Sequence, residues 1–408
     1  MAGRSLLAAE NYVQVPLIWV KIGNYTFGKY EENQAGYKKY PNYVQSLAVT
    51  KVNGTVNKYT LRLTYPLTAD SDPNYFEKVF SSISKSRRIE FTYGDAAVSN
   101  FLYRNEVALV TSVKSNFNLD GNVAIDYTVD AVSQGALGLG GSYSFLRPSS
   151  GKPSDIIRKL LDDPNTGLKD LFPGMRNKTM VAEQGLIPSD DMIVPLDTKT
   201  NMSILAYLDY LVSMMTPDVD ISGDKKAFYM LTFVDDTSGA IDGSYFKIVK
   251  VDAAISHPEA YEVTVGFPGN NYVFNLNVDN DENFSLLYDY QNQLHPQEYV
   301  TRINADGDEE EVYAPVSTSM NPANNTTEQE RSWWAKVTQY PIKASIVIKG
   351  LLRPALLMSY VRLNIMIYGK KHINSGLYII TKQVDEISGS GYKTTLNMTR
   401  IAADSEVL

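Results

Sequence analysis

The sequence of 408 residues predicts a mainly β protein, with two antiparallel β-barrels, an α+β domain inserted between them and a loop-rich segment at the periphery. Three observations support this fold class. Apolar and polar residues alternate with a period of two in both halves of the chain, as in strands that bury one face. Helical periodicity is confined to a few segments. The order of strands and turns in the first half also returns in the second.

The predicted strands keep one polar face. Residues 58–65 place Tyr59, Leu61, Leu63 and Tyr65 on one side and charged or hydroxyl side chains on the other. Such a pattern favours antiparallel sheets or barrels over a parallel sheet covered on both faces. The same alternation occupies residues 88–93, 123–130, 361–368 and 392–398.

Three helices are predicted from caps and apolar spacing. The first begins at Asp72-Pro73 and continues to about Ser86, with proline at the first helical position. The second is expected to be capped by Ser154 and to stop at Asp163-Pro164, and the third spans about residues 201–215. The glycine-rich residues 135–141 are interpreted as a flexible linker into this α+β region.

An internal duplication is one explanation of the repeated order of elements. Residues 88–94 and 362–369 each form a strand that ends in Tyr-Gly, and further strands and a glycine turn follow both. Thr111 with Thr381, and Gly121 with Gly391, share one offset along the chain. Chance resemblance among hairpins is the alternative. If the duplication is real, three copies of the chain would present six similar domains.

Composition excludes several classes of site. Cysteine is absent and there are only three histidines, so disulfides, thiolate nucleophiles and Cys-ligated metals are ruled out. The net charge of −8 argues against a dedicated binder of nucleic acid or anionic membranes. No segment approaches the ~18 uninterrupted apolar residues of a membrane helix, and residues 1–10 lack the apolar core of a secretory signal.

No catalytic, cofactor-binding or metal-binding residue is predicted. The acidic run from Asp306 to Glu311 lacks the spacing of a Ca²⁺ loop and is interpreted as a solvated loop or docking tail. Residues 135–141 lack the Lys-Ser/Thr ending of a phosphate loop, and no Gly-x-Ser-x-Gly elbow is present. His257, His295 and His372 are interpreted as turn or surface residues. A glycosidase carboxylate pair is not singled out among the 46 acids.

Two segments are candidate subunit or partner interfaces. Trp333 and Trp334 are adjacent, so on a helix at most one of them faces the local core comfortably. They either cover the side of a barrel or anchor an interface. The second segment, around Pro354, is more apolar than a solvated turn. It is either a buried crossover or an oligomer-facing hairpin, and its candidate residues are Leu351, Leu352, Leu356 and Leu357.

The C-terminal stretch from Tyr340 to Ile401 resembles the central hub proteins of the baseplates of tailed, contractile phages and related injection systems. The residues that carry the resemblance are 346–354 (IVIKGLLRP), 363–369 (LNIMIYG), 375–381 (SGLYIIT) and 391–400 (GYKTTLNMTR). Residues 19–131 fit the first tube-like barrel of that family less specifically. The resemblance implies a homotrimer whose tube-like barrels form a six-domain ring, adapting a sixfold tail tube to a threefold spike or lysin. No fused spike or lysozyme domain is evident before Leu408, so the puncturing piece is expected to be a separate chain.

The resemblance also implies a domain division and a set of partners. We expect a first tube-like β-barrel at 1–145, the inserted α+β domain at 151–240, a second barrel at 241–280 with 335–403, and a loop-rich peripheral insertion at 281–334. Expected partners are further copies of the chain, the tail tube protein, the central spike or tail lysin, and baseplate wedge proteins, with DNA only in transit. The expected location is the virion, after assembly in the host cytoplasm. The alternative functions are a carbohydrate- or receptor-binding tail protein and, less favoured, a cell-wall hydrolase.

Overall fold

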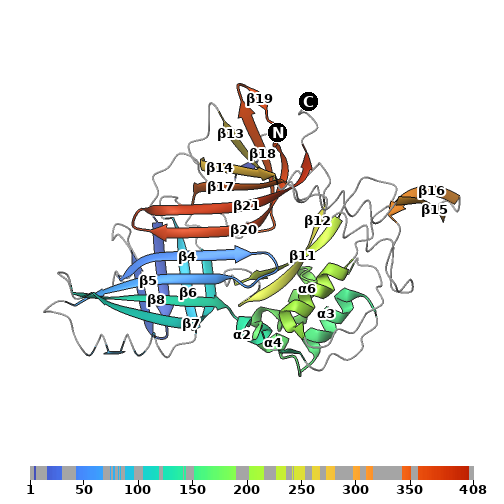
Figure 1. The fold of residues 1–408 in the computed structure, drawn as a ribbon. Coiled ribbons are helices and arrows are strands. Elements are labelled where there is room, and N and C mark those ends of the chain that lie inside the picture. Colours follow the sequence, from blue (N-terminus) through green and yellow to red (C-terminus); the bar gives the residue numbers. More distant parts are fainter. Residues whose placement is uncertain are drawn as a thin grey trace.

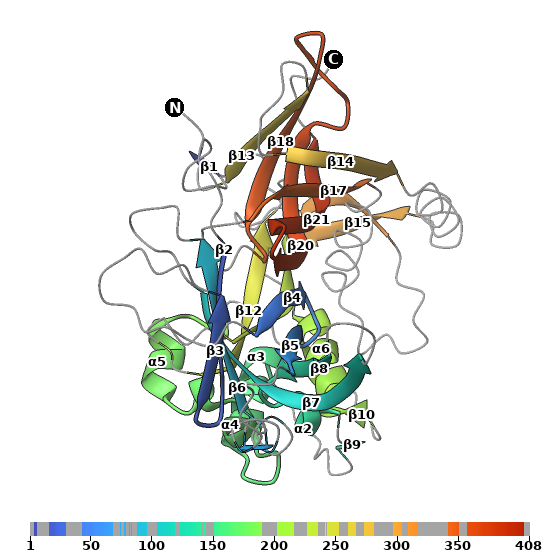
Figure 2. The ribbon, with the colours of Figure 1, turned by 90° about the vertical axis from the view of Figure 1, so that its left-hand side faces the viewer.

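The fold is described from a computed structural model of the chain, shown in Figures 1 and 2. The structure describes residues 4–5, 16–29, 43–67, 74, 77–78, 81, 83, 88–95, 104–118, 123–140, 142–143, 151–189, 202–215, 227–235, 241, 243–252, 260–266, 273–280, 297–303, 309–315, 342–350 and 357–403. No helix in these ranges is both long enough and apolar enough to cross a membrane.

The first β unit is an antiparallel sheet with the strand order β4-β5-β8-β7-β6-β2-β3. One face of each strand is buried, as the alternation predicts: Leu61 and Ile89, for example, are fully buried. The strands are β2 (Pro16–Ile22), β3 (Tyr25–Lys29), β4 (Val44–Val52), β5 (Lys58–Pro66), β6 (Arg88–Asp95), β7 (Arg104–Asn118) and β8 (Ala124–Ser133).

The antiparallel β class is confirmed, but the sheet is not a closed barrel. In the described residues, no backbone ladder joins the edge strands β3 and β4. They meet instead through aromatic rings, since the Phe27 and Tyr43 centroids lie 5.9 Å apart and those of Tyr43 and Tyr65 lie 5.1 Å apart. β3 spans only five residues, which leaves little backbone for a closing ladder.

The second β unit has the order β14-β17-β21-β20-β18-β13-β1, with the short β19 (Lys370–Lys371) hydrogen-bonded to β18. β1 and β13 pair in parallel, as do β13 and β18, and the remaining pairs are antiparallel. The strands are β1 (Arg4–Ser5), β13 (Tyr261–Gly266), β14 (Val273–Asn280), β17 (Ile342–Lys349), β18 (Tyr360–Ile367), β20 (Gly376–Ser388) and β21 (Gly391–Ala403).

The two units share their strand order. In chain order, β2, β4, β5, β6, β7 and β8 correspond to β13, β14, β17, β18, β20 and β21, and each set is arranged in space in the same sequence. β-Bulges recur at corresponding places, after Val44 and Val273 and after Val110 and Ile380. One difference is that β2 pairs antiparallel to β6, whereas β13 pairs parallel to β18.

Thr111 and Thr381, which share an offset in the sequence, are the bulged residues of the two long hairpins. The Thr111 hydroxyl donates to the Asp130 carbonyl at 3.1 Å, and the Thr381 hydroxyl donates to the Asn397 carbonyl at 3.3 Å. β-Bulges are specific features that related folds retain, not random irregularities. They therefore favour duplication over chance resemblance among hairpins.

The units are joined edge to edge. The second half of β20, residues 382–388, pairs antiparallel with residues 46–52 of β4. Figure 1 shows this as a continuous stack, with β20 and β21 in red directly above β4 and β5 in blue. Fifteen strands therefore form one connected sheet.

The inserted region is an α+β unit with its own apolar cluster, and it packs beside the first sheet (Figures 1 and 2). Its strands β11 (Ala227–Val234) and β12 (Tyr245–Asp252) form an antiparallel pair. Its other elements are α2 (Ala136–Leu139), β9 (Ser142–Tyr143), α3 (Pro153–Asp162), α4 (Leu168–Leu171), η1 (Pro173–Met175), α5 (Lys178–Glu183), β10 (Met202–Ser203) and α6 (Ile204–Met214).

The predicted helices are found, with two corrections nearby. Ser154 is not the cap of α3, because Pro153 already occupies the first turn and Lys152 precedes it. Residues 135–141 are not a flexible linker throughout, because residues 136–139 form α2 and Leu139 is fully buried. The third helix does begin at a cap, where Ser203 accepts from the Ala206 amide at 3.1 Å. In the first predicted helix, residues 74, 77, 78, 81 and 83 are helical.

The region predicted to be loop-rich contains a hairpin, β15 (Gln297–Ile303) with β16 (Glu309–Pro315). Part of the acidic run, Glu309 to Glu311, therefore starts a strand instead of lying in a loop. Residues 281–296, 304–308 and 316–341 lie outside the described residues.

Candidate functional site

Charged, amide and hydroxyl side chains form a buried network where the two β units and the inserted domain meet. None of its members is more than 8% exposed. We call it the junction network. Its members are Lys51, Asn57, Tyr59, Tyr93, Arg104, Glu106, Ser133, Asp235, Ser244, Gln383, Asp385, Tyr392 and Thr394.

An ion pair between Arg104 of β7 and Asp385 of β20 connects the two β units. Asp385 also accepts from Gln383 at 2.8 Å, Thr394 at 2.6 Å and Tyr392 at 3.2 Å. Burial disfavours the charge on Arg104, but Asp385 together with Tyr392, Tyr93 and Glu106 outweighs it, so the pKa of the guanidinium lies well above its ordinary value. Arg104 therefore keeps its charge inside the fold, and both side chains of the pair are buried.

A second ion pair, between Lys51 of β4 and Glu106 of β7, lies within the first unit. Tyr59 and Tyr93 donate to Glu106 at 2.8 and 2.9 Å. Burial alone would raise the pKa of Glu106, but Lys51 holds it below its ordinary value. Burial also raises the pKa of both tyrosines well above 10, which keeps their phenols protonated as donors.

Asp235, which directly follows β11, ties the inserted domain to the first unit. Ser244 donates to Oδ1 at 2.7 Å, while Ser133 and Asn57 donate to Oδ2 at 2.7 and 2.8 Å. Burial nevertheless raises the pKa of this carboxyl above its ordinary value. The Asp235 carbonyl also accepts from the Val107 amide at 3.1 Å.

Tyr59 lies 2.8 Å from both Glu106 and Asp235. A phenol has one proton and cannot donate to two carboxylates at once. Tyr59 therefore donates to one of the two carboxylates at a time, and the two bonds compete for its proton.

Replacing Asp235 with asparagine is expected to flatten part of the pH dependence of stability. A raised folded-state pKa means that the proton stabilises the fold below the unfolded pKa of about 3.9, and that this contribution is lost as pH rises through the folded pKa. The melting temperature of Asp235→Asn relative to that of wild type should therefore increase as the pH rises from 4 to 7. Asp155→Asn, at an exposed carboxylate of α3, is the control. A difference that does not change with pH contradicts the assignment.

The chemical capacity of the junction network is structural. Its carboxylates are buried and occupied by hydrogen bonds, so no substrate reaches them. Within the described residues, no group of three His, Asp or Glu side chains could hold a metal ion. Its hydrogen bonds and ion pairs favour one arrangement of the packed elements, although Asn57 Oδ1 and Gln383 Oε1 are buried without a hydrogen-bond partner among the described residues.

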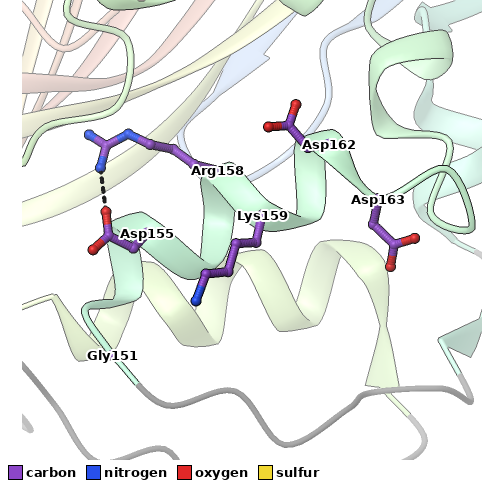
Figure 3. Close-up of a pocket in the computed structure, with 6 residues that line it drawn as sticks. All are labelled: Gly151, Asp155, Arg158, Lys159, Asp162 and Asp163. Atoms are coloured by element: carbon purple, nitrogen blue, oxygen red, sulfur yellow. Dashed lines mark hydrogen bonds and ion pairs between the residues drawn. The ribbon is translucent and has the colours of Figure 1, made fainter.

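A surface hollow of about 550 Å³ lies along α3 and the residues that flank it, from Gly151 to Asp163 (Figure 3). Most of its charged side chains already have partners. Arg158 donates to Asp155 at 2.9 Å and to the Ile187 carbonyl at 2.8 Å, and Asp162 pairs with Lys178 at 2.7 Å. The hollow is thus a solvated, ion-paired helix face.

Five of the six predicted interface residues, Trp333, Trp334, Leu351, Leu352 and Leu356, lie outside the described residues. Leu357 is 9% exposed and belongs to the apolar cluster of the second β unit. For this residue the structure favours the buried crossover. The interface assignment of the set stays a prediction.

The junction network was not predicted from the sequence, although the strand patterns carry a signal of it. Lys51 continues the inward alternation of Leu47 and Val49, and Asp385 stands in phase with Ile387. Charged residues in phase with a buried apolar face must be paired or neutralised. Such breaks in a strand pattern could have identified candidate members, but not their partners.

No protein-family model matches the chain, and no curated protein matches it. Similar solved structures are tail and secretion proteins. A tail protein from Neisseria meningitidis has a TM-score of 0.49 and 10% identity, covering 94% of this chain and 96% of that one. The 43 kDa tail protein of prophage MuSo2 from Shewanella oneidensis also has a TM-score of 0.49 and 10% identity, covering 95% and 98%.

A third similar structure is a type VI secretion component from E. coli, described as similar to bacteriophage T4 tail proteins. It has a TM-score of 0.46 and 10% identity, covering 90% of this chain and 75% of that one. Phage tails and injection systems, the group named from the C-terminal motifs, therefore appear again among the similar structures.

Proposed function

We propose that the chain is a non-enzymatic structural protein of a phage-type tail baseplate, a homotrimeric central hub that adapts a sixfold tail tube to a threefold spike or lysin. The observation that carries this proposal is the pairing of two β units with the same strand order and matching bulges, edge to edge in one sheet. Three copies in a ring present six similar units on one face and three identical chains on the other.

The junction network supports the same function. An adapter between two symmetries must hold its two units at a fixed angle. The Arg104–Asp385 ion pair and the ladder between β4 and β20 both cross the boundary between the units. A buried network of directional hydrogen bonds and ion pairs permits far fewer arrangements than an apolar contact of equal size.

The assembled hub would lie in the virion, after assembly in the host cytoplasm, between the tail tube protein, the spike or tail lysin and the baseplate wedge proteins. DNA would pass through its centre only in transit. The net charge of −8 suits a channel to which DNA does not adhere. A strongly basic lumen in the assembled ring would contradict this part of the proposal.

The distribution of tyrosines favours the hub over a carbohydrate-binding protein. Stacking on sugars needs tyrosines gathered on one exposed surface. Of the tyrosines whose side chains the structure describes, only Tyr368 is exposed, and the others are buried or half-buried along strands and helices. This pattern suits aromatic packing inside sheets.

The trimer is tested by light scattering on the purified chain over a range of concentrations. We expect a mass near three times 45.5 kDa, with electron micrographs showing closed rings with a central opening. A mass that stays at 45.5 kDa at every concentration contradicts a self-assembling hub. A stable dimer would contradict the threefold symmetry itself.

A further inference from the structure

The pairing of β20 with β4 joins the two β units. In the described residues, the equivalent edges of β7 and β14 have no partner strand. Within each chain, residues 382–388 of β20 pair with residues 46–52 of β4. β7 is the equivalent of β20 in the first unit, and β14 is the equivalent of β4 in the second. In the described part of the chain, β14 pairs only with β17, and β7 pairs with β6 only up to Leu109.

The bulges set this equivalence residue by residue. Ser112 and Lys382 are the first paired residues beyond the bulges of β7 and β20, so residues 112–118 correspond to 382–388. Val44 and Val273 precede the bulges of β4 and β14, so residues 44–51 correspond to 273–280. The open edges can therefore be compared with the closed ones position by position.

Residues on the open edges are more exposed than their equivalents on the paired edges, as expected if a neighbouring strand is missing. Leu47 in β4 is fully buried, whereas its equivalent Leu276 in β14 is half-buried. Ile387 in β20 is 1% exposed, whereas its equivalent Phe117 in β7 is 61% exposed. Inside the chain, Ile387 and Leu47 face each other across the ladder. Phe117 and Leu276 are the corresponding pair without its contact.

We propose that β7 of one copy pairs antiparallel with β14 of the next copy, in the register that joins β20 to β4 within each chain. The partner is a second copy of this chain, and the inference rests on the proposed ring and specifies its interface. The register places Phe117 opposite Leu276 and Lys114 opposite Asp279. The first pair is apolar, and the second joins opposite charges, which stabilises directly opposed strand residues.

The β7 edge and the β14 edge are different surfaces, so neighbouring copies associate head to tail. Each copy contributes one β7 edge and one β14 edge, and a contact between unlike surfaces produces a ring when its rotation closes. In the isolated chain, the Lys114 side chain is 76% exposed and lies 4.0 Å from Asp130. An exposed lysine on an open edge blocks unspecific strand pairing. Opposite Asp279, the same charge selects the correct partner.

The absence of cysteine in the natural chain allows the register to be tested by cross-linking. We would combine Lys114→Cys with Asp279→Cys, oxidise the assembled protein and separate it on a non-reducing gel. The matched control combines Val384→Cys with Thr50→Cys, the equivalent pair within one chain. The control should close within monomers, and the test pair should yield covalent dimers and trimers with nothing larger. Each single variant should remain uncross-linked.

The outcomes separate this inference from the proposed function. If light scattering shows a trimer and the control closes, but the test pair does not link chains, the interface is wrong and the hub remains. If the chain is monomeric and no link forms, both are wrong. Charge reversal gives a second readout. Lys114→Asp or Asp279→Lys alone should raise the concentration at half-dissociation by at least about twofold, and the double reversal should restore it. Failure of that rescue overturns the Lys114–Asp279 pairing.

Discussion

Asp385→Leu is expected to lower the free energy of unfolding by about 3–5 kcal/mol. The substitution leaves the Arg104 guanidinium buried without its counter-charge. It also removes the acceptor used by Thr394, Tyr392 and Gln383. Because this ion pair joins the two β units, the loss should appear as earlier separation of the units. Urea unfolding followed by circular dichroism and by limited proteolysis measures both effects.

A double-mutant cycle isolates the ion pair. Arg104→Met alone should also destabilise, whereas Arg104→Met with Asp385→Leu should cost less than the two single changes combined, because no buried charge is left unpaired. Asp155→Leu is the control, since its exposed pair with Arg158 on α3 should contribute about 0–1 kcal/mol. Strict additivity of the two junction variants would show that Arg104 and Asp385 do not act as a pair.

Glu106→Gln is expected to cost a similar ~3–5 kcal/mol at neutral pH, because it leaves the Lys51 ammonium buried beside a neutral amide. The pKa of Glu106 is lowered in the fold. Its stabilising contribution is therefore present above the unfolded pKa of about 4.3 and is lost as pH falls through the folded pKa. The difference between variant and wild type should shrink below about pH 4. Thermal melts across pH 3–7 measure it.

Glu90→Gln is the matched control for Glu106→Gln. Glu90 lies on the neighbouring strand β6 and forms exposed ion pairs with Lys21 at 3.5 Å and Arg88 at 3.1 Å. Pairs of this kind contribute little to stability, so the control should melt close to wild type. Equal losses from both substitutions would mean that burial of the Lys51–Glu106 pair is not the cause.

The fold class was predictable because strand alternation is a local property of the sequence. Residues 58–65 and 392–398 alternate cleanly and lie in β5 and β21, and the spacing of α6 was equally clear. Local signals failed where a neighbour decided the outcome. Gly138 reads as a linker residue in sequence, yet a Cβ there would approach Leu171 to 2.5 Å. Its helix forms because that side chain covers it.

The candidate site was out of reach for a different reason. Arg104 and Asp385 are 281 positions apart, and Asn57 and Asp235 are 178 apart. No periodicity in one sequence indicates which distant residues meet. The prediction of a closed barrel failed for the same reason. Alternation predicts a half-buried strand, but it does not indicate whether the edge strands β3 and β4 pair. The duplication was the better guide, since Thr111 and Thr381 did mark equivalent bulges.

The ladder between β4 and β20 also has a consequence in time. At roughly 5–20 residues per second, synthesis of the 281 positions from Arg104 to Asp385 takes roughly 15–60 s. Strands β2 to β8 are all made before that interval ends, while the Lys51–Glu106 pair can already form. Until β20 is synthesised, however, Arg104 lacks its counter-charge, and the edge of β4 can pair with strands of other chains. The N-terminal half of this protein is thus a nascent intermediate in need of protection, and β20 is the strand that completes it.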